Sequence, residues 1–202
     1  IRAAVAAGAK IINISLRLGS YGALKDSADW AREQGALVFL APGNTNRALG
    51  GAQLALNTRN VIVVSGTDQN DNRWQDDLIT GSTYGQWIDL SAPAANILAP
   101  QPGLPEEYGL FRGTSFSAPI AAAAAALAWA INPALSADEV EAMLFATAVD
   151  LGPAGWDQEF GHGRVNFAAV ADAAWASVPE PSVVGVLLLA GAWLGRRGRA
   201  TA

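Results

Sequence analysis

Cysteine is absent from this chain of 202 residues, which excludes disulfide bonds and metal centres built on cysteine. Charge is also scarce: 15% of the residues are charged and 51% are hydrophobic, a composition that excludes a disordered chain. Basic residues number 13 against 18 acidic ones, and three of them, Arg196, Arg197 and Arg199, lie at the extreme C-terminus. The remainder is therefore acidic, and we expect no binding to nucleic acid.

Short hydrophobic runs alternate with helical patterns in the first third of the chain. Buried strands are predicted at residues 10–15 and 36–41, a third strand at 60–65, and an amphipathic helix at 22–34. This order indicates βαβ units, so we predict an α/β fold with a mostly parallel sheet between layers of helices. Functional side chains in such folds lie at the carboxyl ends of strands. The first two ends carry Ser15 and Leu16, then Gly43 and Asn44.

The longest alanine-rich stretch covers residues 119–131 and contains no charged residue. It predicts a helix that is apolar on every face and buried inside the domain, with Pro119 in its first turn. Ser115 precedes this helix and would lie at the positive end of its dipole, a favourable place for an attacking hydroxyl group. The alternative is that the hydroxyl groups of Thr114, Ser115 and Ser117 only cap the helix.

The second half of the domain is predicted to contain two further helices. Ser136 and Glu139 form a capping-box pattern that opens a helix ending near Thr147. The last helix is expected at residues 167–175, after a glycine-rich turn at 160–166, and residues 104–110 form a predicted hairpin or loop before Ser115.

The segment Gly113-Thr114-Ser115-x-x-x-Pro119 resembles the nucleophile motif of the subtilisin-like serine proteases, the subtilases. Residues 11–16 and 41–44 resemble two further subtilase segments, and the resemblance extends over about residues 1–175. It implies a three-layer subtilisin-like fold in which Ser115 is the nucleophile of a serine endopeptidase. It also implies that Asn44 donates to the oxyanion, and that Ser15, Leu16 and Gly43 line the pocket for a polypeptide substrate.

Two local departures from the family pattern do not touch the chemistry. Arg17 stands where a glycine is usual after the Ser-Leu pair, which could narrow the pocket, and Ile120 replaces a histidine that follows the proline in many members.

A third departure concerns the general base that a serine nucleophile needs. The one histidine, His162, lies in the glycine-rich turn and is expected to have no catalytic duty. In subtilases the catalytic aspartate and histidine precede the region that this chain matches. We therefore expect a C-terminal fragment that is inactive alone and unstable, because its truncated sheet exposes strand edges. The alternative is a catalytically inactive, subtilase-like surface module with a binding or structural role.

Four aspartates, Asp68, Asp71, Asp76 and Asp77, suggest a cation site, since calcium prefers several oxygen ligands. Their spacing lacks the regularity of an EF-hand, which favours a solvated polar loop. The resemblance implies that no cofactor is required for the chemistry. It leaves open whether the protein binds structural calcium, and we assign no calcium ligands.

The C-terminal tail divides into a proline-rich linker at residues 177–182 and a segment at 183–202 with an apolar stretch at 183–194 and three arginines. Twelve apolar residues span about 18 Å as a helix, short of a bilayer core of about 30 Å. The order resembles the PEP-CTERM sorting signal of Gram-negative bacteria. It implies export to the cell envelope or beyond, transient membrane insertion and processing by an exosortase. An ordinary C-terminal helix packed on the domain, or an integral membrane protein, is the weaker alternative.

Overall fold

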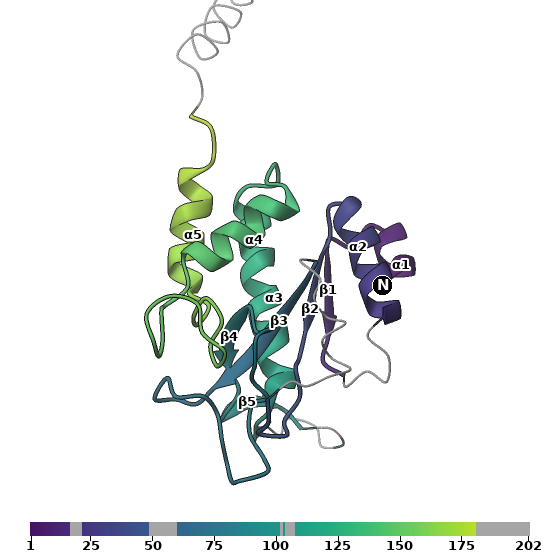
Figure 1. Cartoon of the computed structure of the whole chain (residues 1–202). Coiled ribbons are helices and arrows are strands. Elements are labelled where there is room, and N and C mark those ends of the chain that lie inside the picture. Colours follow the sequence, from purple (N-terminus) through teal and green to yellow (C-terminus); the bar gives the residue numbers. More distant parts are fainter. Residues whose placement is uncertain (17–21, 49–59, 102, 104–107, 181–202) are drawn as a thin grey trace, which may run out of the picture.

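The computed structural model describes residues 1–16, 22–48, 60–101, 103 and 108–180. A four-stranded parallel sheet with the order β1-β2-β3-β4 forms its centre (Figure 1). The strands are β1 (Ile11–Ile14), β2 (Leu37–Leu40), β3 (Val61–Thr67) and β4 (Leu90–Pro93). The predicted α/β architecture with a parallel sheet between helices is therefore confirmed.

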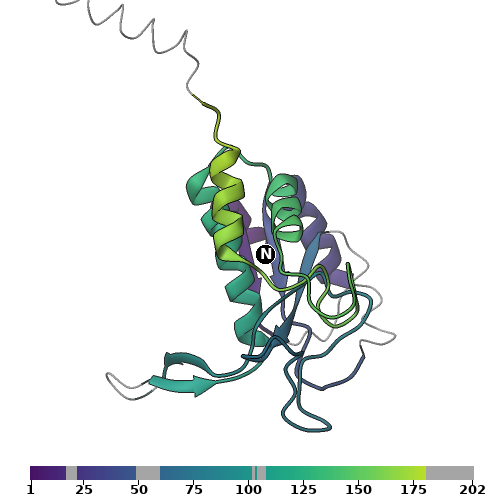
Figure 2. The same cartoon turned by 90° about the vertical axis from the view of Figure 1, so that its left-hand side faces the viewer.

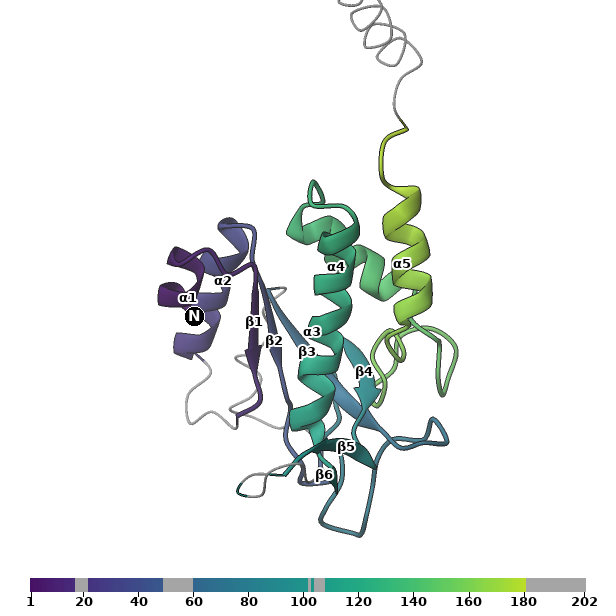
Figure 3. The same cartoon turned by 180° about the vertical axis from the view of Figure 1, so that it is seen from behind.

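Two helices, α1 (Arg2–Ala6) and α2 (Gly22–Glu33), cover one face of the sheet, and three cover the other (Figures 1 and 3). The latter are α3 (Thr114–Ile131), α4 (Ala137–Ala146) and α5 (Phe167–Ala176). Successive residues of β2 point to opposite faces: Val38 and Leu40 pack with α2, while Leu37 and Phe39 pack with α3. The sheet thus separates two hydrophobic cores, the larger of which lies beneath α3.

Strand β1 lies at the edge of the four-stranded sheet, and none of its four residues is fully buried. The prediction of a buried first strand was wrong in this respect. The hydrophobic run does form a strand, but this strand pairs with β2 on one edge only. No described strand pairs with its other edge.

Helix α3 begins at Thr114, five residues earlier than predicted, and Pro119 lies inside it rather than in its first turn. The predicted burial on every face was also wrong, since Ala123, Ala126 and Ala130 form an exposed stripe. The helix packs against the sheet and against α4 and α5, and this stripe of small alanines faces water. On length and composition α3 could span a membrane, but half of it is buried within the domain, as expected for a core helix.

The two later helices confirm their sequence signals. Ser136 accepts from the backbone N–H of Glu139, whose carboxylate accepts from the Ser136 backbone, so the capping box is present at the start of α4. Helix α5 begins after Asn166, whose side chain accepts from the N–H of Ala169.

A small hairpin precedes α3 and projects from the domain (Figure 2). Its strands are β5 (Ile97–Pro100) and β6 (Tyr108–Phe111), which pair in antiparallel register. The hairpin interpretation of this region is confirmed for β6, while residues 104–107 lie outside the described residues. Arg17 and the apolar segment at 183–194 also lie outside them, so the domain boundaries of the tail stay a prediction.

Candidate active site

Ser115 is the second residue of α3, at the end of the sheet where the parallel strands terminate. The N-terminus of a helix carries a partial positive charge, which favours an oxygen that gains negative charge there. Gly113 occupies the N-cap position and no side chain of the helix caps it. The hydroxyl group of Ser117 donates instead to the carbonyl of Pro93, at 3.2 Å. The interpretation of these hydroxyl groups as helix caps is therefore wrong.

Asn44 comes from the segment after β2 and meets the start of α3 through its side-chain oxygen. The Asn44 Oδ1 atom accepts from the Thr114 backbone N–H at 2.9 Å and from the Thr114 hydroxyl at 2.8 Å. These two bonds fix the direction of the amide group. Among the described residues, Asn44 Nδ2 donates to no protein atom, so both of its N–H bonds are available to a ligand.

Gly113 allows the close approach of Asn44 to the helix. Its backbone has a φ of 131°, a conformation that residues with a side chain rarely adopt. A Cβ atom at this position would lie 3.0 Å from Asn44 Nδ2. The glycine of the sequence motif is therefore required both by its own backbone and by the amide group beside it.

Ser15, at the end of β1, contacts Ser115 through two hydrogen bonds. The Ser15 hydroxyl donates to the Ser115 backbone carbonyl at 2.7 Å, and the Ser115 hydroxyl donates to the Ser15 backbone carbonyl at 3.4 Å. Gly43 also lies nearby, since its carbonyl accepts from the Thr114 hydroxyl at 3.3 Å. Leu16 is 68% exposed and open to a ligand. The fold thus brings Ser15, Gly43, Asn44 and Ser115 together.

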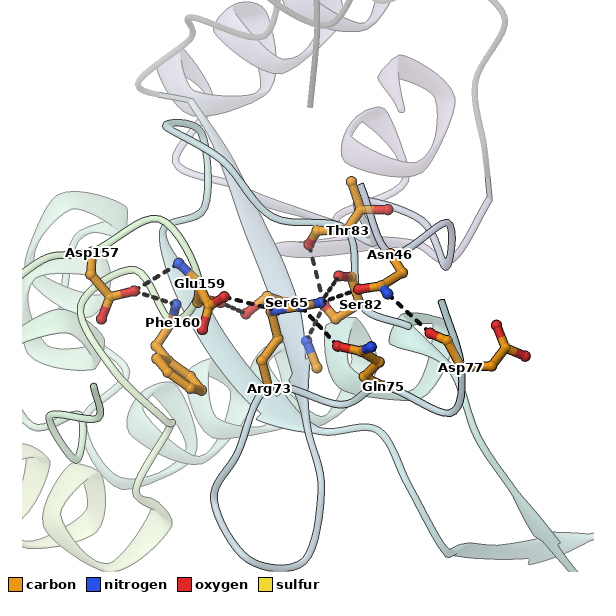
Figure 4. Close-up of polar contacts among 11 residues, drawn as sticks. Asn46, Ser65, Arg73, Gln75, Asp77, Ser82, Thr83, Asp157, Glu159 and Phe160 are labelled. Carbon is orange, nitrogen blue, oxygen red and sulfur yellow. Dashed lines mark hydrogen bonds and ion pairs between the residues drawn. The ribbon is translucent and has the colours of Figure 1, made fainter. Parts of the chain in front are cut away.

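A polar network holds the Asn44 segment in place (Figure 4). Arg73, only 12% exposed, donates to Asn46 Oδ1 at 2.8 Å, to the Ser82 carbonyl at 2.7 Å and to Glu159 Oε1 at 3.1 Å. The Thr83 N–H donates to the Gly43 carbonyl at 3.0 Å. The guanidinium group therefore joins three segments, one of which contains Asn44.

His162 lies away from Ser115. Its backbone N–H donates to the Asp89 carbonyl at the amino end of β4, whereas the start of α3 is bound to Ala94, beyond the carboxyl end of that strand. The imidazole ring stacks on Phe145 at 4.4 Å between centroids, and burial lowers its pKa. Its position is that of a packing residue, and the described residues near Ser115 include no other histidine.

The four aspartates of the predicted polar loop each have protein partners. Asp68 accepts from the N–H groups of Asn70 and Asn72, and Asp77 accepts from those of Ile79 and Thr80, which lowers the pKa of Asp77. Ion pairs join Asp71 to Arg164 and Asp76 to Arg112. Within the described part of the chain, no three acidic or histidine side chains converge as a metal site would require.

Three residues of the site were not singled out as site residues by the sequence. Thr114 holds Asn44, Asn13 donates to the Ser15 hydroxyl at 3.1 Å, and Arg73 supports the Asn44 segment. Thr114 belongs to the motif, so its place next to Ser115 was a usable signal. Asn13 was visible as the one amide within a hydrophobic strand. Nothing in the sequence around Arg73 distinguishes it from a surface arginine.

Comparison with known proteins agrees with this geometry. The model of the subtilase family, Peptidase S8, matches residues 1–163. Subtilisin Savinase of Lederbergia lenta is 34% identical over 160 residues, covering 79% of this chain and 55% of Savinase. The minor extracellular protease Epr of Bacillus subtilis is 34% identical over 172 residues, covering 84% of this chain and 25% of Epr.

A solved structure of a lanthipeptide protease superposes with a TM-score of 0.73 at 25% identity, over 85% of this chain and 63% of that protein. The predicted subtilisin-like fold is confirmed. The chain spans about half the length, or less, of these two curated relatives. By its sequence, its fold and the arrangement around Ser115, the chain belongs to the subtilase family.

Proposed function

We propose that this chain carries the nucleophile and the oxyanion donor of a subtilisin-like serine endopeptidase. The observation that supports this most directly is the fixed pair of Ser115 and Asn44. The Asn44 amide oxygen is held by Thr114, the residue directly before Ser115, so the orientation of the amide group is fixed next to the nucleophile. An oxyanion donor has to be fixed in this way before the reaction, because a donor that must reorient contributes little.

In the proposed reaction the Ser115 Oγ atom attacks the carbonyl carbon of a peptide bond, and its proton passes to a general base. Negative charge develops on the carbonyl oxygen, where Asn44 Nδ2 donates a hydrogen bond. The C–N bond then breaks, the proton is transferred to the leaving amine, and water hydrolyses the acyl-enzyme. The loss of one such donor costs about 10²–10³-fold in rate, a magnitude known from a subtilisin itself.

The base and its carboxylate partner are proposed to come from residues outside these 202. His162 is occupied by its stacking on Phe145. The chain spans 55% of Savinase and 25% of Epr, so the relatives contain residues with no counterpart here. We expect the isolated chain to be inactive.

The test uses the gene product that carries this chain and an active-site-directed fluorophosphonate. Labelling forms a bond between the Ser115 oxygen and phosphorus, with loss of fluoride and transfer of the hydroxyl proton to the base. We expect labelling at Ser115, its complete loss in Ser115→Ala, and a fall of about 10²–10³-fold in peptidase kcat/KM in Asn44→Ala. Ser177→Ala, at the far end of α5, serves as the matched control. Labelling that persists in Ser115→Ala would contradict the proposal.

The second candidate is a non-catalytic module that uses the same fold to bind other molecules. The position of His162 favours it, because the described residues offer Ser115 no base. It predicts a well-folded gene product that does not react with the fluorophosphonate. The two candidates are thus separated by labelling of the parent protein alone.

The substrate is proposed to be a polypeptide whose side chain enters the pocket between Ser15, Leu16 and Gly43. We further propose that the protein is a monomer. We also propose that it acts outside the cytoplasm, because its relative Epr is an extracellular protease. The tail at residues 177–202 is proposed as a PEP-CTERM-like sorting signal for a Gram-negative envelope, with an exosortase-type enzyme as its processing partner. Removal of residues 177–202 should abolish transfer of the domain to the cell surface, which immunoblotting of envelope and medium fractions would measure.

A further inference from the structure

Pro119 leaves a carbonyl group without its helical partner directly at Ser115. In an α-helix the N–H of each residue donates to the carbonyl four residues earlier. Pro119 lies inside α3 and has no N–H, so the carbonyl of Ser115 cannot accept the bond that every other carbonyl in the middle of a helix receives. The residue with the reactive hydroxyl group is therefore also the one whose carbonyl loses its helical donor to Pro119.

The Ser15 hydroxyl group supplies the donor that the Ser115 carbonyl lacks. It donates to the Ser115 carbonyl at 2.7 Å, a distance typical of a well-formed bond from a hydroxyl group. Ser15 comes from the end of β1, one hundred residues before Ser115, so the bond joins the sheet to the first turn of the helix. A strand end thus provides the donor that the helix lacks.

Asn13 determines the direction of the Ser15 hydroxyl. Its Nδ2 atom donates to Ser15 Oγ at 3.1 Å, so the Ser15 oxygen accepts on one side. The hydrogen of the Ser15 hydroxyl group then points to the Ser115 carbonyl oxygen. Asn13 and Ser15 are two residues apart and lie on the same side of the extended chain, which allows this contact.

The opposite side of the same helical turn is bound to Asn44 through Thr114. Together with the Ser15 bond, this holds the backbone on both sides of the Ser115 Cα atom. A fixed backbone fixes the direction of the Cα–Cβ bond, and with it the position of the Ser115 oxygen relative to the Asn44 amide. Misplacement of a nucleophile by about 1 Å can cost roughly 10²-fold in rate.

We propose that Ser15, oriented by Asn13, is a positioning residue for the nucleophile: its hydroxyl replaces the N–H that Pro119 cannot donate to the Ser115 carbonyl. This inference rests on the proposed function of Ser115. It gives the Ser15 side chain a role distinct from the substrate pocket, because its hydroxyl is turned to the helix.

A double-mutant cycle between Ser15 and Pro119 tests the proposal in the gene product that carries this chain. Ser15→Ala removes the donor, and we expect the second-order rate of fluorophosphonate labelling to fall about tenfold, as the loss of one hydrogen bond would give. Ser15→Thr keeps the hydroxyl group and should stay within about threefold of the parent. Pro119→Ala restores an N–H four residues after Ser115, so in that background Ser15→Ala should slow labelling by no more than about twofold.

Three results would overturn it. Equal slowing by Ser15→Ala in both backgrounds would show that the hydroxyl does not replace the missing N–H. Slowing by Ser15→Thr as large as by Ser15→Ala would point to packing or pocket shape, and an unchanged rate in Ser15→Ala would remove the role. Ser177→Ala is the matched serine control, and circular dichroism checks that each variant is folded.

A second measurement keeps this inference distinct from the proposed function. The cycle comprises the parent, Ser15→Ala, Pro119→Ala and the double variant. The denaturation midpoints of these four proteins report the Ser15–Pro119 coupling without any chemistry. If the parent protein does not label at all, the proposed function fails and the positioning role fails with it, whatever the midpoints show. If the parent labels but Ser15→Ala slows labelling equally in both backgrounds, the positioning role alone is overturned.

Discussion

One hydroxyl group, that of Thr114, joins two of the segments that form the site: the segment after β2 and the start of α3. It donates to Asn44 Oδ1 and lies within reach of the Gly43 carbonyl, and its residue is fully buried. The Thr114 backbone N–H also holds Asn44 Oδ1. The amide therefore has two anchors, of which the hydroxyl is the one that a side-chain change can remove.

Thr114→Val keeps the shape of the side chain and removes the hydroxyl. We expect labelling by the fluorophosphonate to slow by about 3- to 30-fold, because the Asn44 amide loses one of its two anchors. The free energy of unfolding should fall by only about 1 kcal/mol. Thr114→Ser, which keeps the donor, should restore most of the rate. An unchanged rate in Thr114→Val would mean that the backbone N–H suffices to hold Asn44.

At the scale of elements, Arg73 joins the segment after β2, the loop after β3 and the turn before His162. The guanidinium group donates hydrogen bonds to Asn46, Ser82, Glu159 and Gln75, and it also lies 4.7 Å from the centre of the Tyr84 ring. Such a planar fork with several acceptors and a stacked ring cannot be reproduced by lysine, although the charge is the same.

Arg73→Lys should lower the free energy of unfolding by about 1–3 kcal/mol, because the buried Ser82 and the partly buried Asn46 lose their donor. Arg112→Lys is the matched control: Arg112 is 68% exposed and has one ion pair, so the change should cost less than about 1 kcal/mol. Chemical denaturation of both variants measures the difference. Equal midpoints for the two would show that the Arg73 network contributes no more than a surface ion pair.

Local signals in the sequence predicted the helices and strands well. The capping box at Ser136 and the glycine after α2 appear where they were expected, since each depends on a few neighbouring residues. The start of α3 was misplaced because Pro119 normally marks a first turn, and the bond from Ser15 that compensates for it is not local. The pairing of β4 with β3, through a short apolar run, was also not predicted.

The members of the site were predictable and their contacts were not. Ser115, Asn44, Ser15 and Gly43 were identified through motif resemblance, and the parallel sheet explains why strand ends so distant in sequence meet. The bonds from Thr114 and Asn13 depend on rotamers and on the exact approach of α3 to the sheet. Burial on both faces of β1 was overestimated because its composition resembles that of β2, whereas its place at the edge depends on the whole sheet.

The charge of Asp89 couples the stability of the domain to pH. Desolvation raises the pKa of this carboxyl group to about 7, with a further contribution from Glu141, while its hydrogen bond from the Val63 N–H acts in the opposite direction. The ordinary pKa of 3.8 applies in the unfolded chain. The folded state therefore binds the proton more tightly than the unfolded state does.

The stability that this proton provides is fully present below about pH 4 and is lost as the pH rises through about 7. Asp89→Asn is neutral at every pH and keeps an acceptor for the Val63 N–H. Its free energy of unfolding should exceed that of the parent by about 2–4 kcal/mol at pH 8, and the two should converge near pH 4. Asp172→Asn, on the exposed side of α5, serves as the control with the same charge change. A parallel pH dependence for the parent and Asp89→Asn would contradict the assignment.

The division of the sheet between two cores constrains how the chain can change its length. Within β2, Leu37 and Phe39 belong to one core, and Val38 and Leu40 belong to the other. One inserted or deleted residue inside this strand would exchange every following side chain between the two cores. The exchanged side chains differ in size, with Phe39 on the α3 side and Val38 on the α2 side, so each core would receive side chains that do not fit it. Insertions and deletions can therefore be accommodated only in the loops that connect the strands and helices.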